Sequence, residues 1–209
     1  MPKIVNKEEK KAQILEASIR IFSKKGLNNT KISDIAENAA IGKGTIYEYF
    51  KSKDEIFAAS FYYFMEKFEK SISRQLFRVH NPLEKIRTYF SAWADMFEGN
   101  HLEYLEIVLD FWAEGVRERN DPWMIDLNTL YSKNRNMLDT LLSECLAKGE
   151  IKQVDTKLIA SIMLGTLDGI LIQWIMDGKA FTMKKAVLLF VETMIDGLKL
   201  TGESVIEQK

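Results

Sequence analysis

The chain has 209 residues, of which 46% are hydrophobic and 28% charged, enough to form a core in a small domain plus a medium one. One cysteine excludes an internal disulfide and a cysteine-built zinc site, and the scarcity of helix breakers (11 Gly, 3 Pro) favours an all-helical fold. The net charge of −1 combines a basic segment 1–52, with ten Lys/Arg against six Asp/Glu, and an acidic remainder, so only the N-terminal part is expected to meet a polyanion.

The first predicted helix runs from Asn6 to Gly26. Asn6 and Glu9 have the spacing of a capping box, in which each side chain bonds to the backbone N–H of the other residue. Gly26 is expected to end the helix, because glycine readily adopts the left-handed conformation found at helix C-termini.

Two short helices are expected next, with a tight turn between them. Thr30 is a good N-cap for the first. After a break at residues 40–42, the second is expected from Lys43 to Phe50, with Ile46 and Phe50 facing inward one turn apart. A longer helix followed by two short ones is typical of a helix-turn-helix, whose last helix can enter the major groove of DNA.

From Lys53 onward the expected helices are longer and richer in aromatic residues. Asn-Pro and Asp-Pro starts and glycine ends place them at about 53–78, 82–99, 101–118, 122–149, 155–176 and 182–200. The stretch 158–176 is apolar enough to suggest a membrane span, but its glycines and polar residues favour a buried helix of a soluble bundle. The charged N-terminus lacks the apolar segment of a signal peptide, so a cytoplasmic location is expected.

A resemblance to TetR-type (TetR/AcrR) transcription regulators is carried by residues 30–57, TKISDIAENAAIGKGTIYEYFKSKDEIF. The resemblance implies an all-α protein with a three-helix helix-turn-helix DNA-binding domain at 1–52. A six-helix ligand-sensing and dimerisation domain would follow at 53–209. The implied function is a ligand-responsive regulator, by default a repressor, that binds palindromic double-stranded operator DNA as a homodimer. It implies neither catalysis nor a cofactor, metal ion or membrane partner.

By this resemblance, eight residues fall at positions that touch DNA. Lys43 and Lys53, together with Lys51, can neutralise phosphates, and Gly44 lets the backbone approach DNA closely. The eight are Thr30, Lys31, Lys43, Gly44, Thr45, Tyr47, Tyr49 and Lys53.

Two positions depart from the pattern of the family. Ala40 stands in the turn, where these proteins usually have glycine. A positive φ there would cost alanine on the order of 1 kcal/mol, so the turn is either strained or shaped differently. Gly42 stands where a hydroxyl residue is usual; it is an acceptable N-cap but gives up a possible phosphate contact.

The larger domain contains all four tryptophans and many further aromatic residues, more than helix packing usually requires. Some are therefore expected to line an apolar effector pocket. The predicted lining is Trp93, Phe97, Asp110, Phe111, Trp112, Tyr131, Asp168 and Trp174. Such a pocket favours a small hydrophobic or aromatic effector, neutral or weakly cationic, over a sugar or nucleotide. Asp168 either anchors this effector or makes a structural hydrogen bond; both alternatives remain open.

The last two helices are expected to form the dimer interface. Gly165 and Gly169, four residues apart, allow close helix approach, and the apolar row of the last helix needs a partner surface. The predicted interface residues are Gly165, Gly169, Ala186, Phe190 and Met194.

The alternatives to a regulator are a helical-bundle enzyme and an adaptor protein without DNA binding. A di-iron enzyme needs two Glu-x-x-His motifs, whereas the chain has two histidines in all, and the one motif with this spacing, Glu98 to His101, straddles Gly99. The basic charge of residues 1–52 argues against an adaptor.

Overall fold

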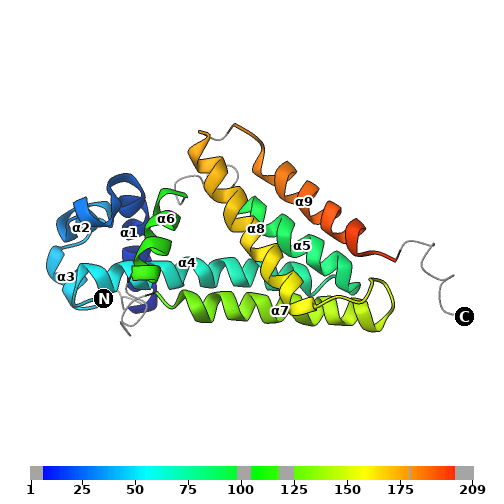
Figure 1. Ribbon diagram of the computed structural model, residues 1–209. Coiled ribbons are helices and arrows are strands. Elements are labelled where there is room, and N and C mark those ends of the chain that lie inside the picture. The colour runs from blue at the N-terminus through cyan, green and yellow to red at the C-terminus, as the bar shows by residue number, and fades with distance from the viewer. Residues whose placement is uncertain (1–6, 98–104, 118–124, 179, 201–209) are drawn as a thin grey trace, which may run out of the picture. The chain divides into compact units, whose positions relative to one another are not determined.

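The computed structural model describes residues 7–97, 105–117, 125–178 and 180–200. Within these ranges the chain forms helices joined by turns, with an isolated bridge between Ile151 and Lys199, so the all-α prediction is confirmed (Figure 1). The helices are α1 (Lys7–Asn29), α2 (Ile32–Asn38), α3 (Lys43–Tyr47), α4 (Lys53–Leu76), α5 (Pro82–Asp95), α6 (Leu105–Arg117), α7 (Leu127–Ala147), α8 (Thr156–Met176) and α9 (Met183–Leu198).

The helices divide between two compact units. Unit 1 contains α1, α2, α3, α4 up to Glu69, and α6. Unit 2 contains the end of α4 together with α5, α7, α8 and α9. The packing thus places α6 with the N-terminal helices, whereas the functional boundary after residue 52 stays a prediction.

An aromatic cluster forms the centre of unit 1. The ring of Phe57 on α4 lies 5.2 Å from that of Phe22 on α1 and 4.6 Å from that of Phe111 on α6. Phe61, one turn after Phe57, lies 4.9 Å from Phe111. Because three helices contribute to this cluster and its side chains are buried, it fixes α4 and α6 against α1.

The end of α1 is held by several short hydrogen bonds. Gly26 has a φ of +72°, so the helical conformation breaks there as predicted. The hydroxyl of Thr30 donates to Gly26 O at 2.8 Å, and Lys53 Nζ donates to Leu27 O at 2.7 Å. The prediction that Thr30 is the N-cap of α2 is wrong, because its hydroxyl is used at the end of α1; the N-cap is Lys31, whose N–H donates to Asp34 Oδ2 at 3.0 Å.

The turn between α2 and α3 contains Ala40 in the left-handed region, with a φ of +49°. Of the two alternatives predicted for this turn, the strained one is therefore correct. Gln13 on α1 donates to Ala39 O at 2.6 Å, and Ile41 N donates to Ala36 O at 3.0 Å, so the turn is held from two sides. α3 ends at Tyr47, three residues earlier than predicted, because the chain turns at 48–49 before Phe50 enters the core.

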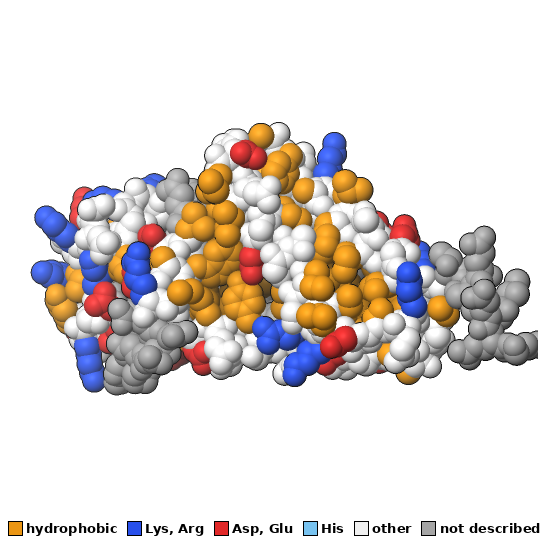
Figure 2. Space-filling model, in the orientation of Figure 1, with side chains coloured by type: hydrophobic (Ala, Val, Ile, Leu, Met, Phe, Trp, Pro, Cys, Tyr) orange, Lys and Arg blue, Asp and Glu red, His pale blue; other side chains and the backbone are white. Residues whose placement is uncertain are grey.

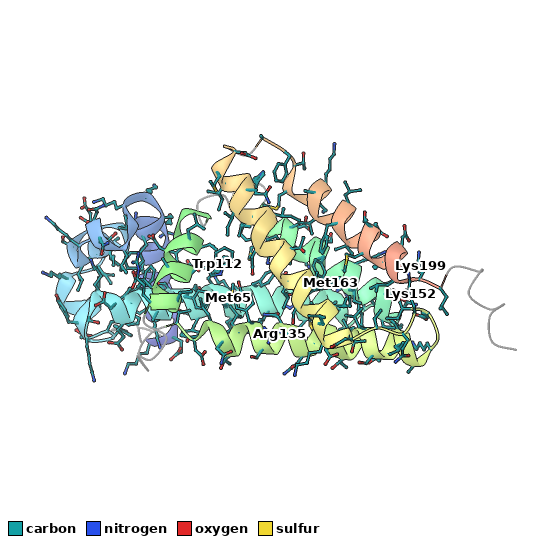
Figure 3. All side chains as sticks on the ribbon, in the orientation of Figure 1. Met65, Trp112, Arg135, Lys152, Met163 and Lys199 are labelled. Atoms are coloured by element: carbon teal, nitrogen blue, oxygen red, sulfur yellow. The ribbon has the colours of Figure 1, made fainter. Side chains whose placement is uncertain are left out.

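In unit 2, α9 packs along α5 and against α8 (Figure 1). Arg87 on α5 binds Glu192 on α9 through two hydrogen bonds of 2.8 and 2.9 Å. The N-caps of α5 and α8 form as ordinary capping chemistry dictates, with Asn81 accepting from Glu84 N and Asp155 from Leu158 N. Figure 3 shows Lys152 and Lys199 close together, where the bridge joins the end of α9 to the turn after α7.

The beginning of α7 differs from the prediction. The Asp121-Pro122 start lies outside the described residues, as does the motif from Glu98 to His101, but Ile125 and Asp126 are not helical and α7 begins at Leu127. Near its end, Cys145 is fully buried, and burial raises the pKa of its thiol to about 11.

α8 is long and apolar enough to cross a membrane by length and composition alone. Its core-facing side carries Met163, Leu167 and Leu171, all buried. Its other side exposes Leu158 and Met176, so the prediction of a buried helix holds for one face of a single chain only.

Candidate DNA-binding face and effector region

α3 has two faces: a polar face that is exposed to solvent and an apolar face that packs into the core of unit 1. Ile46 is fully buried and Phe50 nearly so, which fixes the rotation of the helix. Lys43 and Gly44 are consequently exposed, and the side chain of Tyr47 is 50% exposed. Lys43 Nζ lies 5.9 Å from the centre of the Tyr47 ring, a cation–π contact between residues one turn apart.

The space around this face is open. A Cβ added to Gly44 would meet nothing within 4 Å, so a large partner can approach the backbone there. Lys31 is exposed, whereas Thr45 and Tyr49 are half-buried. Figure 2 shows Lys and Arg side chains, interspersed with acidic ones, over the part of unit 1 that holds these helices.

Two of the predicted DNA contacts are already engaged within the protein. Thr30 is 2% exposed, so a phosphate contact through its side chain would require its hydrogen bond to Gly26 to break. The ammonium of Lys53 has Leu27 O and Asn28 O as acceptors, at 2.7 and 3.4 Å. It keeps one further N–H for a phosphate, because an ammonium has three donors.

The start of α4 is fixed by two side-chain hydrogen bonds that were not expected from the sequence. Ser52 Oγ accepts from Glu55 N at 3.0 Å, and Glu55 Oε2 accepts from Lys51 N at 2.6 Å. The S-x-x-E spacing is the signal that could have found the first of these bonds.

Three of the residues predicted to line a pocket lie on α6 in unit 1. Phe111 is 1% exposed and belongs to the aromatic cluster. Asp110 Oδ2 accepts from Leu27 N at 3.4 Å, which ties α6 to the chain just after the break in α1. Trp112, labelled in Figure 3, is half-buried.

The other five lie in unit 2. The rings of Trp93 and Phe97 pack edge to face at 4.7 Å. Trp174 is 5% exposed, and its indole N–H donates to Phe181 O at 2.6 Å. Tyr131 on α7 and Asp168 on α8 form a hydrogen-bonded pair.

The hydroxyl of Tyr131 donates to Asp168 Oδ2 at 2.9 Å. Burial raises the pKa of the Asp168 carboxyl to about 6, and the hydrogen bond from Tyr131 offsets this only in part. Asp168 therefore makes the structural hydrogen bond that was one of its two predicted roles.

A polar residue of unit 2 that the sequence analysis missed is Arg135. It follows Tyr131 by one turn of α7, is half-buried, and its Nε is shielded from solvent without a hydrogen-bond partner. The nearby charges Lys133 and Asp139 hide it in the sequence, and its spacing of three residues from Leu138 becomes informative only once Leu138 is known to be buried.

Apolar and small residues, some exposed and some half-buried, follow one another along α8 and α9. On α8 they recur with spacings of four and three residues, as in a coiled-coil seam, and a Cβ added to Gly165 or Gly169 would meet nothing within 4 Å. On α9, Leu189 is 71% exposed, whereas Phe190 is half-buried, with its ring 6.2 Å from that of Phe90. Ala186 and Met194 are also half-buried. The α8 series is Leu158, Ile162, Gly165, Gly169, Ile172 and Met176.

Two family models match the chain, and they meet between residues 60 and 61. Residues 14–60 match the model described as "Bacterial regulatory proteins, tetR family". Residues 61–197 match "YsiA-like protein, C-terminal region".

Curated relatives and solved structures agree with these matches. The chain is 25% identical over 193 residues to the fatty acid metabolism regulator protein of Bacillus subtilis (strain 168), covering 92% of this chain and 97% of the relative. The structure of the transcriptional regulator FadR from Bacillus subtilis in complex with stearoyl-CoA superposes with a TM-score of 0.77 at 25% identity, covering 90% and 98% of the two chains. A TetR regulator from Haloarcula marismortui ATCC 43049 shares the fold alone, with a TM-score of 0.82 at 16% identity over 92% of this chain and all of the other.

Proposed function

Since the chain belongs to the TetR family of bacterial transcription regulators, we propose that it is a cytoplasmic repressor that binds a palindromic operator as a homodimer. An effector with a long apolar chain would release it from DNA. The observation that carries the DNA-binding half of this proposal is the exposed face of α3, where Lys43, Gly44 and Tyr47 stand over a buried Ile46.

The DNA contacts divide by chemistry into two groups. Lys31, Lys43 and Lys53 are proposed to neutralise phosphates, which contributes affinity without sequence preference. The base edges and the adjacent DNA backbone are proposed to be contacted by Thr45, Tyr47 and Tyr49. The protein backbone at Gly44, which has no side chain, is proposed to approach the DNA there as well. Thr30 is engaged at the end of α1 through its bond to Gly26 O.

The test of DNA binding is selection from a random duplex pool, followed by binding measurements at several salt concentrations. The selected site should be palindromic, because a two-fold dimer presents two copies of α3. Lys43→Ala should weaken binding to all sequences alike and reduce the salt slope by about one unit. Lys148→Ala, an exposed lysine in unit 2, is the matched control and should leave the slope unchanged. A pool that yields no enriched sequence would contradict the proposal.

The dimer is proposed to form through α8 and α9. A four-helix interface would cover the exposed α8 series and Leu189, which a monomer would leave in water. Gly165 and Gly169 would let the paired α8 helices approach closely.

The effector is proposed to be a long-chain acyl compound. The Bacillus subtilis regulator that this chain resembles was solved with stearoyl-CoA bound, and the curated relative is a regulator of fatty acid metabolism. The aromatic and aliphatic interior of unit 2 suits a hydrocarbon chain. An acyl thioester carries a nucleotide, so this proposal departs from the neutral or weakly cationic molecule expected from the composition.

Effector binding is proposed to act by shifting the population of the dimer between two spacings of the DNA-binding helices. Within unit 1, the bond from Leu27 N to Asp110 and the aromatic cluster link α6 to α1 and α4, so a displaced α6 would carry these helices with it. Stearoyl-CoA should raise the melting temperature and release the selected DNA, whereas coenzyme A alone should do neither. Release by coenzyme A alone would refute the acyl class.

A further inference from the structure

One stripe of α7 changes from apolar to polar along the helix. Leu138, Leu142 and Cys145 are 0%, 1% and 0% exposed, so this stripe faces the core of unit 2. Continued toward the start of the helix with the same three- and four-residue spacing, the stripe contains Arg135 and then Tyr131. A cationic side chain thus occupies a position that helix geometry assigns to the interior.

Three other polar side chains on this part of α7 have partners. The hydroxyl of Tyr131 donates to Asp168 at 2.9 Å. Asn134 accepts from the hydroxyl of Tyr89 at 3.0 Å and donates to Leu130 O at 2.9 Å. Asp139, one turn after Arg135, accepts from the hydroxyl of Thr156 at 2.6 Å.

Arg135 differs from these residues. Its Nε is shielded from solvent and bonds to nothing, and among the residues that the structure describes no carboxylate pairs with its guanidinium. Arginine keeps its charge at every physiological pH, so it cannot escape the cost of burial by losing a proton. The shielded Nε–H lacks an acceptor, which is destabilising, and an anion supplied from outside would provide one.

We propose that Arg135 binds the anionic group of the effector, a carboxylate or a phosphate, while the hydrocarbon chain lies among the apolar side chains of unit 2. The planar guanidinium can donate two parallel hydrogen bonds to either group. Tyr131 and Asn134, on the same part of α7, hold the surroundings of Arg135 through their bonds to α8 and α5. Met163 on α8, labelled with Arg135 in Figure 3, is one of the fully buried apolar residues of this unit.

This inference rests on the proposed acyl effector and names the group that recognises its head. A free fatty acid presents a carboxylate, and an acyl-CoA presents phosphates. Two anionic probes, oleate and stearoyl-CoA, therefore distinguish the source, and oleyl alcohol is the uncharged probe.

The experiment measures dissociation constants of the three probes for the full-length wild type and for Arg135→Met, which removes the charge and keeps much of the length. Binding of at least one anionic probe should weaken about 10- to 100-fold, the usual range for a lost charge-assisted hydrogen-bonded pair. Oleyl alcohol should bind both proteins alike. Lys133→Met makes the same charge change at an exposed position of α7 and should alter no constant more than about twofold.

Arg135→Lys and the melting temperature of the ligand-free protein separate binding from a structural role. Arg135→Lys should retain part of the affinity, because it keeps a charge but loses the planar fork. Arg135→Met should raise the melting temperature without ligand, because it removes a half-buried cation whose Nε–H has no acceptor. A fall in this melting temperature, with probe affinities unchanged, would show a structural arginine and overturn the inference.

The remaining outcomes are distinct. If only oleate loses affinity, the anion is a carboxylate; if only stearoyl-CoA does, it is a phosphate. Equal affinities of wild type and Arg135→Met for both anionic probes would overturn the role of Arg135 and leave the acyl effector standing. If neither anionic probe binds the wild type, the acyl effector fails and the inference fails with it.

Discussion

Polar side chains are held differently in the two units. In unit 1, Thr30 bonds to Gly26 O, Ser52 accepts from Glu55 N, and Lys53 binds the carbonyl groups at the end of α1. Unit 2 contains a half-buried carboxyl, Asp168, with a raised pKa and a half-buried cation, Arg135, whose Nε has no partner. Unit 1 also holds an unpartnered buried group, the hydroxyl of Ser60, but that group is neutral, whereas the unpartnered Nε–H of unit 2 belongs to a cation that an anionic ligand could pair.

The largest effect should come from removing the aromatic centre of unit 1. Phe111→Ala should cost about 3–5 kcal/mol of unfolding free energy, because the ring is buried between Phe57 and Phe61. Urea unfolding followed by circular dichroism measures this cost. If Phe111 lined an open pocket, as the sequence predicted, the cost would be below about 1 kcal/mol.

Breaking the dimer should abolish tight DNA binding while leaving both units folded. Leu189→Glu places a charge in the proposed interface and should yield monomers with at least about 100-fold weaker operator binding. Phe190→Glu is a poorer test, since Phe190 packs on Phe90 within the same chain. Phe77→Glu, at another exposed residue, is the control. Sedimentation of Leu189→Glu as a dimer at micromolar concentration would rule out this interface.

Replacing Asp168 should stabilise the protein at neutral pH. Its pKa is raised from 3.8 to about 6, so it destabilises the folded state above pH 6, and this cost fades as pH falls from 6 to 4. Asp168→Asn should therefore gain about 1–2 kcal/mol at pH 7.5 and nothing at pH 3.5, while still accepting from Tyr131. Denaturant midpoints across this range test the prediction, and a loss of stability at pH 7.5 would contradict it.

The smallest change in the free energy of unfolding is expected for substitutions in the turn between α2 and α3. Ala40→Gly relieves a left-handed alanine but increases the entropy of the unfolded chain, so the net gain should be about 0.5 kcal/mol. Ala39→Gly, at a buried neighbour in the right-handed region, should instead destabilise. Thermal unfolding of the two variants side by side measures the difference, and a less stable Ala40→Gly would mean that the turn carries no strain.

The features that could be predicted from the sequence are local ones, which depend on residues close together in the chain. The break at Gly26 formed as expected, and of the two alternatives for the turn at Ala40 the strained one is found, since each is decided within a few residues. The N-cap role of Thr30 was wrong because another acceptor, Gly26 O, competed for its hydroxyl.

What depends on distant residues was harder to predict. Phe111 was assigned to a pocket because its partners, Phe57 and Phe61, lie far away in the chain. Arg135 was missed because charged neighbours on both sides mask a stripe that becomes evident only once Leu138 is known to be buried.

The buried Cys145 makes the protein convenient for distance spectroscopy. Thiol-reactive labels attack the thiolate, and a fully buried thiol with a pKa of about 11 stays unlabelled in the folded protein. A cysteine introduced at the exposed Glu48, just after α3, would therefore carry a spin label selectively without replacement of the native one. In a dimer, the two labels would report the separation of the two copies of α3 directly, before and after an acyl probe is added.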